Sequence, residues 1–581
     1  MLKKLAQNIG EYKLPSILSP LFVTGEVIME VLMPFLAAVI IDKGINGGDI
    51  TVVRNTGIML IVITLLSLAF GALSGINAAK ASSGFAKNLR RSMFYKVQTF
   101  AFENIDKFST SSIITRLTTD VTRLQNAYQM IIRIAVRSPA MLIFSLVMAL
   151  SVNKKLSLIF LAVVPVIAIG LLIIIKNSHK IFVWVFKRYD RLNTVVQENV
   201  RGMRVVKAFV RQDHEKEKFE DVSESIYKNF VKAERIMSFN SPLMQVSIYA
   251  SILTISWLGA KIIVNSGATA LTTGQLTSLI SYTTQILSSL MMISMMFVMF
   301  TMSKASAERI VEILDEESVL NNPENPLTEV KDGSIEFKNV SFGYNQKMCL
   351  KNVNLTINSG ETVGIIGGTG SSKSTLVQLI PRLYDVKEGE LLVGGVDVRE
   401  YDIESLRDKV AVVLQKNVLF SGTVKDNLRW GNNEATEEEM VRVCQLAQAD
   451  EFIQKFPEKY DTHIEQGGSN VSGGQKQRLC IARALLKKPK ILILDDSTSA
   501  VDTRTDALIK KAFAEEIPDT TKLIIAQRIS SVQDADKIVI MENGEVDDVG
   551  THEELLNRNK IYQEIYYSQQ KGGNEDGSTG R

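Results

Sequence analysis

The sequence has few cysteines and no excess of either charge. Its three cysteines, Cys349, Cys444 and Cys480, form no CxxC pair and show no spacing that suits zinc or a disulfide framework. All three lie in the second half, which we therefore interpret as a reduced, cytosolic domain. The 66 basic and 63 acidic side chains leave a net charge of +3, so the composition does not indicate a nucleic-acid partner.

The length and the apolar content predict at least two domains, one of them in a membrane. A chain of 581 residues exceeds the roughly 250–300 residues at which a single hydrophobic core stops growing. Its 46% hydrophobic content excludes a disordered chain. The basic lead with Lys3, Lys4 and Lys13 has no small-residue cleavage site, so we expect no removable signal peptide.

Six apolar runs in the first three hundred residues are long enough to cross a bilayer, which requires roughly 20 residues as helix. We predict spans at 16–41, 56–79, 127–152, 156–176, 243–265 and 276–302.

The loops between these spans predict the orientation, because Lys and Arg collect on the cytoplasmic side. Residues 80–126 contain eight Lys and Arg and residues 176–235 contain fourteen, whereas the other three connections contain at most two each. We therefore expect both termini in the cytoplasm of a multi-pass protein of the cell membrane. The two basic connections are long and helical in pattern, which predicts paired extensions of the membrane helices.

After about residue 318 the pattern becomes that of a soluble α/β domain. Short apolar runs such as TVGIIG, KVAVVL, KILILD and TKLIIA alternate with helical stretches, which is typical of a mostly parallel sheet. We predict a membrane domain at 1–318, a linker at 319–328, a soluble α/β domain at 329–570 and a disordered tail at 571–581.

The strand TVGII runs into a glycine-rich segment, GGTGSSKST, that has the pattern of a P-loop for ATP. Lys373 is expected to reach the β and γ phosphates, and the Ser374 hydroxyl to bind Mg²⁺. A glycine turn that binds nothing is the alternative, but the buried run ILIL ends in Asp495, which supplies the metal carboxylate of such sites. The predicted nucleotide contacts in this loop are Gly367, Thr369, Gly370, Ser371, Ser372, Lys373, Ser374 and Thr375.

A third motif, NVSGGQKQR at 470–478, completes a pattern that resembles the nucleotide-binding domain of ABC transporters. The membrane half is similar to the six-helix domain of ABC exporters, with TRLTTDVTRLQ and RGMRVVKAFVRQ in the cytoplasmic arms. The resemblance implies a membrane α-helical domain of six transmembrane helices fused to an α/β P-loop ATPase domain. Such a half-transporter works as a pair.

The resemblance also implies roles for residues outside the P-loop. Tyr344 would stack on adenine, with core packing as the alternative. Gln415 would contact Mg²⁺ or water and sense the γ phosphate. The signature would bind the γ phosphate of the ATP held by the opposite subunit, through Ser472, Gly473, Gly474 and Gln475.

Three positions depart from the family pattern, which has Gly before the P-loop lysine, Glu after the metal Asp and His after the next strand. This chain has Ser372, Asp496 and Gln527 there, and its four histidines lie elsewhere in the sequence. Asp496 is one methylene shorter than Glu, and a misplacement of about 1 Å can cost roughly 100-fold in rate. We therefore expect impaired hydrolysis at Asp496 and Gln527, as in one subunit of heterodimeric bacterial multidrug exporters. Tolerated drift in a homodimer is the alternative.

Two groups in the predicted spans are candidate cargo contacts. Glu26 and Glu30 share one helical face, as do Arg133 and Arg137, so the acids either attract cationic cargo or belong to a structural ionic network. A methionine face in the last span suits an adaptable binding surface, or ordinary packing. Its members are Met291, Met295 and Met299.

Together these features predict one subunit of an ATP-driven translocase that exports amphiphilic drugs or other hydrophobic small molecules across the lipid bilayer. Its partner would be a second half-transporter with the consensus Glu and His. A lipid or peptide exporter and a nucleotide-gated membrane regulator are the alternatives.

Overall fold

The structure is a computed structural model that describes residues 1–344, 347–496 and 501–575. The chain folds into two compact units. The first contains Met1–Gln98 and Ser109–Glu316, and the second contains Thr99–Phe108 and Glu317–Arg581. The short segment Thr99–Phe108, which was expected in the membrane domain, therefore belongs to the second unit.

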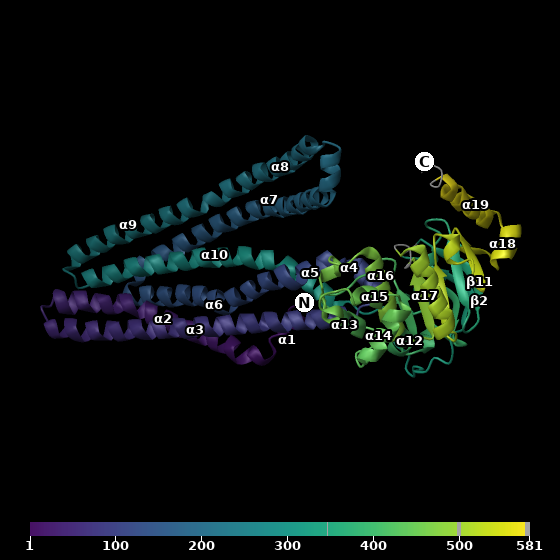
Figure 1. The fold of residues 1–581 in the computed structure, drawn as a ribbon. Helices are drawn as coiled ribbons and strands as arrows, with labels where there is room; N and C mark the ends of the chain where they lie inside the picture. Colours follow the sequence, from purple (N-terminus) through teal and green to yellow (C-terminus); the bar gives the residue numbers. More distant parts are fainter. Residues whose placement is uncertain (345–346, 497–500, 576–581) are drawn as a thin grey trace. The chain divides into compact units, whose positions relative to one another are not determined.

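The first unit consists of long helices with short connections (Figure 1). They are α1 (Leu2–Gln7), α2 (Lys13–Val39), α3 (Ile50–Gln98), α5 (Thr110–Thr115), α6 (Val121–Val152), α7 (Lys154–Ala208), α8 (Gln212–Ser238), α9 (Asn240–Ser266) and α10 (Thr273–Asp315). Helix α2 packs on α3 and α6, α6 on α10, and α7 on α8. Figure 1 shows α7 and α8 as a long antiparallel pair, as the basic connection between spans four and five predicts.

Within the described residues, six stretches are long and apolar enough to cross a membrane, which confirms the predicted number. They are Gly10–Ile45, Ile50–Gln98, Thr110–Val152, Lys154–Phe182, Gln212–Ser266 and Thr273–Met296. Many of their apolar side chains are exposed, including Leu68, Leu161 and Trp257. Apolar exposure of this extent is typical of surfaces that face lipid or another subunit.

The second unit is built around a six-stranded sheet in the order β12-β11-β3-β10-β9-β6, parallel except at β12. Its strands are β3 (Thr362–Gly367), β6 (Val410–Val413), β9 (Ile491–Asp495), β10 (Thr521–Ile525), β11 (Lys537–Glu542) and β12 (Glu545–Gly550). Residues along β9 alternate between two hydrophobic clusters, with Ile491 and Ile493 in one and Leu492 and Leu494 in the other. This central strand is therefore covered on both faces, as its uninterrupted apolar run predicts.

A four-stranded antiparallel sheet and a two-stranded one complete the strands. They contain β1 (Ile335–Phe342), β2 (Leu350–Ile357), β4 (Glu388–Val393), β5 (Val396–Asp397), β7 (Gly422–Thr423) and β8 (His463–Ile464). The helices of this unit are α4 (Phe102–Phe108), α11 (Lys373–Leu379), α12 (Ile403–Lys409), α13 (Val424–Arg429), α14 (Glu437–Leu446), α15 (Asp450–Ile453), α16 (Gly473–Leu486), α17 (Thr503–Glu516), α18 (His552–Arg558) and α19 (Lys560–Glu575). Part of the predicted tail, residues 571–575, lies in α19, and residues 576–581 fall outside the described residues.

Helix α4 is held in the second unit by side chains on both of its faces. Asn104 is buried and donates from Nδ2 to the carbonyl of Glu317 at 3.0 Å. Tyr384 donates from its hydroxyl to Asp106 at 3.0 Å, and its ring lies 6.1 Å from that of Phe102. These contacts explain why a segment between two apolar stretches of the first unit folds with the second unit.

Candidate active site

The candidate site lies where the parallel strands of the large sheet end. Strands β3, β10 and β9 are neighbours, and β6 follows β9. Their carboxyl ends are in register, with Ile525 opposite both Ile365 and Asp495. Parallel strands deliver their following loops to the same edge of a sheet. The topology thereby brings together the P-loop, the two aspartates, Gln415 and Gln527.

The P-loop follows β3, and its backbone conformation leaves little room for side chains. A Cβ at Gly367 would lie 2.1 Å from the carbonyl oxygen of Met541 on β11, so only glycine fits there. Gly370 has a φ of +85°, which glycine adopts without strain. Ser372 has a φ of +70°, where a side chain costs about 1–2 kcal/mol. This backbone explains why the family pattern has glycine at Ser372.

The side chain of Lys373 folds back over the P-loop. Its ammonium donates to the carbonyls of Gly367 at 2.8 Å and Gly368 at 2.9 Å, and to the Ser371 hydroxyl at 3.2 Å. Burial lowers the pKa of Lys373, and the charges of the two aspartates oppose this effect. A cation poised over a loop of backbone N–H groups fits a polyphosphate.

Ser374 and Asp495 lie together, as the metal assignment requires. The Ser374 hydroxyl donates to Asp495 Oδ1 at 3.0 Å. Burial raises the pKa of the Asp495 carboxyl, Asp496 adds to this effect, and Ser374 and Lys373 oppose it. One hydroxyl and one buried carboxylate are oxygen donors of the kind that Mg²⁺ prefers, and Mg²⁺ keeps several waters of its own. These residues fit an Mg²⁺·ATP complex.

Asp496 is held by two amides. Gln527 donates from Nε2 to Asp496 Oδ2 at 2.8 Å, and Gln415 donates to the same oxygen at 3.4 Å. The Asp496 backbone has a φ of +49° and its N–H donates to the carbonyl of Ile525 at 3.0 Å. Both of these amides are neutral, and neither can carry a proton for the carboxylate.

Tyr344 lies just after β1 and packs against two other aromatic side chains. Its ring lies edge-on to Phe342 at 5.1 Å and to Tyr384 at 5.2 Å. Its hydroxyl lies 3.3 Å from the Thr375 hydroxyl and donates to Gln378 at 3.2 Å. Burial raises the pKa of Tyr344, so the phenol is neutral at physiological pH. Tyr344 is 36% exposed as a residue, which leaves surface for stacking on a base.

The signature motif forms the start of α16. Ser472 accepts from the N–H of Gln475 at 3.3 Å, and Gln475 accepts in return from the N–H of Ser472 at 2.9 Å. This capping box fixes the helix start, and Ser472 and Gly473 remain exposed. Within the described residues, no hydrogen bond or ion pair joins these signature residues to the P-loop of the same chain.

Two further residues at this site were not identified from the sequence. Tyr384 packs against Tyr344 and bonds to α4, but no motif marks it. Gln569 on α19 donates to the carbonyl of Gln527 at 2.8 Å and accepts from the N–H of Ile529 at 3.0 Å. It therefore fixes the loop that carries Gln527 from a helix some 40 residues further along the chain.

The candidate cargo residues lie in the helical unit. Glu26 and Glu30 on α2 both pair with Arg137 on α6. Arg133 forms no ion pair within the described residues. On α10 the three methionines predicted to line a cargo surface are exposed: Met291, Met295 and Met299.

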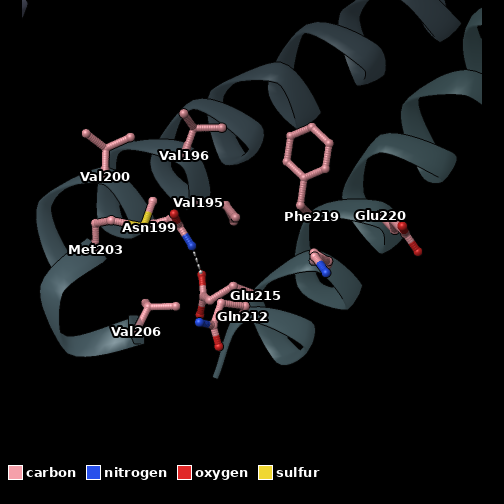
Figure 2. A pocket seen from close by; sticks show the side chains of 11 residues that line it. Val195, Val196, Asn199, Val200, Met203, Val206, Gln212, Glu215, Phe219 and Glu220 are labelled. Carbon is pink, nitrogen blue, oxygen red and sulfur yellow. Dashed lines mark hydrogen bonds between the residues drawn. The ribbon is translucent and has the colours of Figure 1, made fainter. Parts of the chain in front are cut away.

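A separate groove lies at the far end of the α7–α8 pair, with a volume of about 330 Å³. Figure 2 shows Val195, Val196 and Met203 of α7 on one side and Phe219 of α8 on the other. At its base Asn199 donates to Glu215 at 3.1 Å. The turn beyond it exposes Phe209 and Val210. The groove is lined mainly by apolar side chains.

Comparisons with known families agree with this architecture. The family model for the ABC transporter transmembrane region matches residues 16–303, and the ABC transporter model matches residues 350–499. The chain belongs to the ABC transporter family, with the fused membrane and ATP-binding domains of an exporter half-transporter.

Its relatives match over nearly their whole length. The uncharacterised ABC transporter ATP-binding protein YfiB of Bacillus subtilis is 38% identical over 570 residues, which covers 98% of each chain. The uncharacterised ABC transporter ATP-binding protein Mb1304c of Mycobacterium bovis is 33% identical over 576 residues, with 98% of each chain covered. The ATP-dependent lipid A-core flippase of Desulfotalea psychrophila is 30% identical over 570 residues, covering 98% of this chain and 99% of that one.

Proposed function

We propose that this chain is one subunit of a heterodimeric ABC exporter, to which it contributes a degenerate ATP site. The exporter moves amphiphilic drugs or other hydrophobic compounds out of the cell by alternating access. Both termini and the ATPase domain lie in the cytoplasm, an orientation supported by the basic loops. The partner is a second half-transporter with the consensus Glu and His.

The observation that supports this assignment best is the environment of Asp496. A general base must reach the attacking water with a free carboxylate oxygen. Asp496 is one methylene short, and its Oδ2 already accepts from Gln527 at 2.8 Å. A homodimer would contain two such sites, so a competent site requires a different partner.

In a composite site each ATP lies between the P-loop of one chain and the signature of the other. The exposed Ser472 and Gly473 suit this arrangement. This chain would then complete the working site on its partner with Ser472, Gly473, Gly474 and Gln475. Its own P-loop, Gln415 and Gln527 would hold ATP and keep the two ATPase domains in contact between turnovers.

The test compares ATP hydrolysis by the purified chain alone with that of the pair co-expressed with its neighbouring half-transporter. We expect much slower turnover by the lone chain at equal ATP occupancy. Equal turnover would exclude the heterodimer with a degenerate site. The control is Lys373→Ala, which measures the background ATP hydrolysis in each preparation.

For the cargo we propose the exposed face of α10 with Met291, Met295 and Met299, because unbranched, polarizable side chains adapt to varied apolar surfaces. We propose Glu30 as the contact for a cationic group, since it is the less buried of the two acids, with Glu26 beside it. A lipid exporter is the second candidate, and it is favoured by the relative that is named a lipid A-core flippase.

Transport by the pair in vesicles separates these candidates. Stimulation of ATP hydrolysis by amphiphilic cations favours the drug exporter. Stimulation by added lipid, together with movement of lipid between leaflets, favours the lipid exporter. A nucleotide-gated regulator would show neither uphill transport nor cargo-stimulated hydrolysis.

We also propose that the tip of the α7–α8 pair docks on the ATPase domain of the partner. The exposed Phe209 and Val210 support this assignment, because exposed apolar patches mark interaction surfaces. Phe209→Asp should abolish cargo stimulation of ATP hydrolysis and leave basal hydrolysis unchanged. Phe219→Asp, at an exposed residue that lines the groove instead of the turn, serves as the matched control.

A further inference from the structure

The loop that carries Gln527 lies between two fixed points. On one side Ala526 donates its N–H to the carbonyl of Ile365 on β3 at 3.3 Å, and on the other the Ile529 side chain is buried in the core. Gln527 is exposed between them and donates to Asp496 at 2.8 Å. Its amide keeps this position only if the backbone from Ala526 to Ile529 is held in place.

Helix α19 holds this stretch of backbone with a single side chain. Gln569 donates from Nε2 to the carbonyl of Gln527 at 2.8 Å, and its Oε1 accepts from the N–H of Ile529 at 3.0 Å. One amide thus supplies a donor and an acceptor to backbone groups two residues apart. Asn at this position is one methylene too short to reach both groups, and an ionised Glu has no donor.

The packing of α19 determines where Gln569 lies. Tyr562 is fully buried, and Ile565 and Tyr566 pack against the hydrophobic cluster that also contains Ile529. Residues four apart on a helix lie on the same face, so Gln569 follows Ile565 one turn further along this face. The core contacts of α19 therefore place the Gln569 amide beside the loop.

The position of Gln569 suggests a role other than holding the C-terminal helices together. Gln563 on the same helix donates to the carbonyl of Leu556 on α18 at 2.8 Å, which joins one C-terminal helix to the other. Gln569 is exposed, and the net contribution of such neutral hydrogen bonds to stability is modest. Their main effect is on the position of Gln527.

We propose that Gln569 is a positioning residue of the nucleotide site, which acts through Gln527 on the γ phosphate. This inference rests on the proposed function, in which the P-loop and Gln527 hold ATP. ADP has no γ phosphate, so a residue that acts through Gln527 strengthens the binding of ATP and not that of ADP. The C-terminal helix α19 is then part of the device that distinguishes the two nucleotides.

The test compares the affinities of the full-length chain for ADP and for AMP-PNP, a non-hydrolysable ATP analogue, in competition with a fluorescent nucleotide. Gln569→Ala should weaken AMP-PNP binding by roughly fivefold, the loss expected from one hydrogen bond, and leave ADP binding unchanged. Gln569→Glu keeps the size of the side chain and should have the same effect, because it cannot donate to the Gln527 carbonyl. Gln563→Ala is the matched control and should change neither affinity.

A double-mutant cycle shows whether Gln569 acts through Gln527. In a Gln527→Ala background, Gln569→Ala should cause no further loss of AMP-PNP affinity. Additive losses overturn the proposal, as does a Gln569→Ala variant that weakens both nucleotides equally or neither of them. If Gln527→Ala weakens AMP-PNP binding and Gln569→Ala does not, only the positioning role is refuted. If Gln527→Ala leaves both affinities unchanged, the proposed contact of Gln527 with the γ phosphate is refuted as well.

Discussion

The pair Asp496 and Gln527 offers the sharpest test of the catalytic assignment, through Asp496→Glu, Gln527→His and the double variant in this chain alone. In the proposed degenerate site two effects would impair hydrolysis, and the structure allows their sizes to be compared. The Gln527 hydrogen bond to Asp496 is exposed, so releasing it is worth about 1 kcal/mol, or roughly fivefold in rate. The missing methylene displaces the carboxylate by about 1 Å, which costs roughly 100-fold. The length of the side chain should therefore dominate.

We expect Asp496→Glu to raise ATP turnover by up to about 100-fold. Gln527→His alone should raise it by no more than about tenfold, because the short carboxylate still cannot reach the water. The double variant should exceed the product of the two, since the residues contact each other and act as a unit. The assay is steady-state phosphate release, with ATP binding and dimer formation measured on the same samples. The reasoning is refuted if Asp496→Glu leaves turnover unchanged while binding and dimerisation are normal.

Three other predictions address the remaining parts of the molecule. In the co-expressed pair, Gly473→Glu should abolish most ATP hydrolysis, because the new side chain blocks access to the γ phosphate in the partner's site. Asp496→Asn should lower ATP hydrolysis much less. Complete loss of ATP hydrolysis in Asp496→Asn would show that this carboxylate is catalytic. Neutralising Glu26 and Glu30 together should weaken export of cations more than of neutral compounds, and an equal loss would assign both to the ionic network alone. Ser372→Gly should raise the free energy of unfolding of the ATPase domain by about 1 kcal/mol because it relieves the left-handed backbone, and an unchanged Tm would show that the loop carries no such strain.

The sequence alone predicted the elements whose signal is local. Six apolar runs indicated six membrane helices, since a bilayer requires about 20 consecutive apolar residues. The P-loop, Asp495 and the signature could be recognised from the sequence because each is a short segment with its own pattern. The substitutions Ser372, Asp496 and Gln527 were also evident, because a motif shows its own departures.

Tertiary structure decided what depends on which segments meet. The sheet order places β3 beside β10 and β9, and only this arrangement brings Gln527 within 2.8 Å of Asp496. The left-handed backbone of Ser372 explains why the family pattern has glycine at this position, which the sequence alone could not show. The sharing of Arg137 by Glu26 and Glu30 likewise comes from helix packing. Helical periodicity places two acids on one face, but it does not state which base they meet.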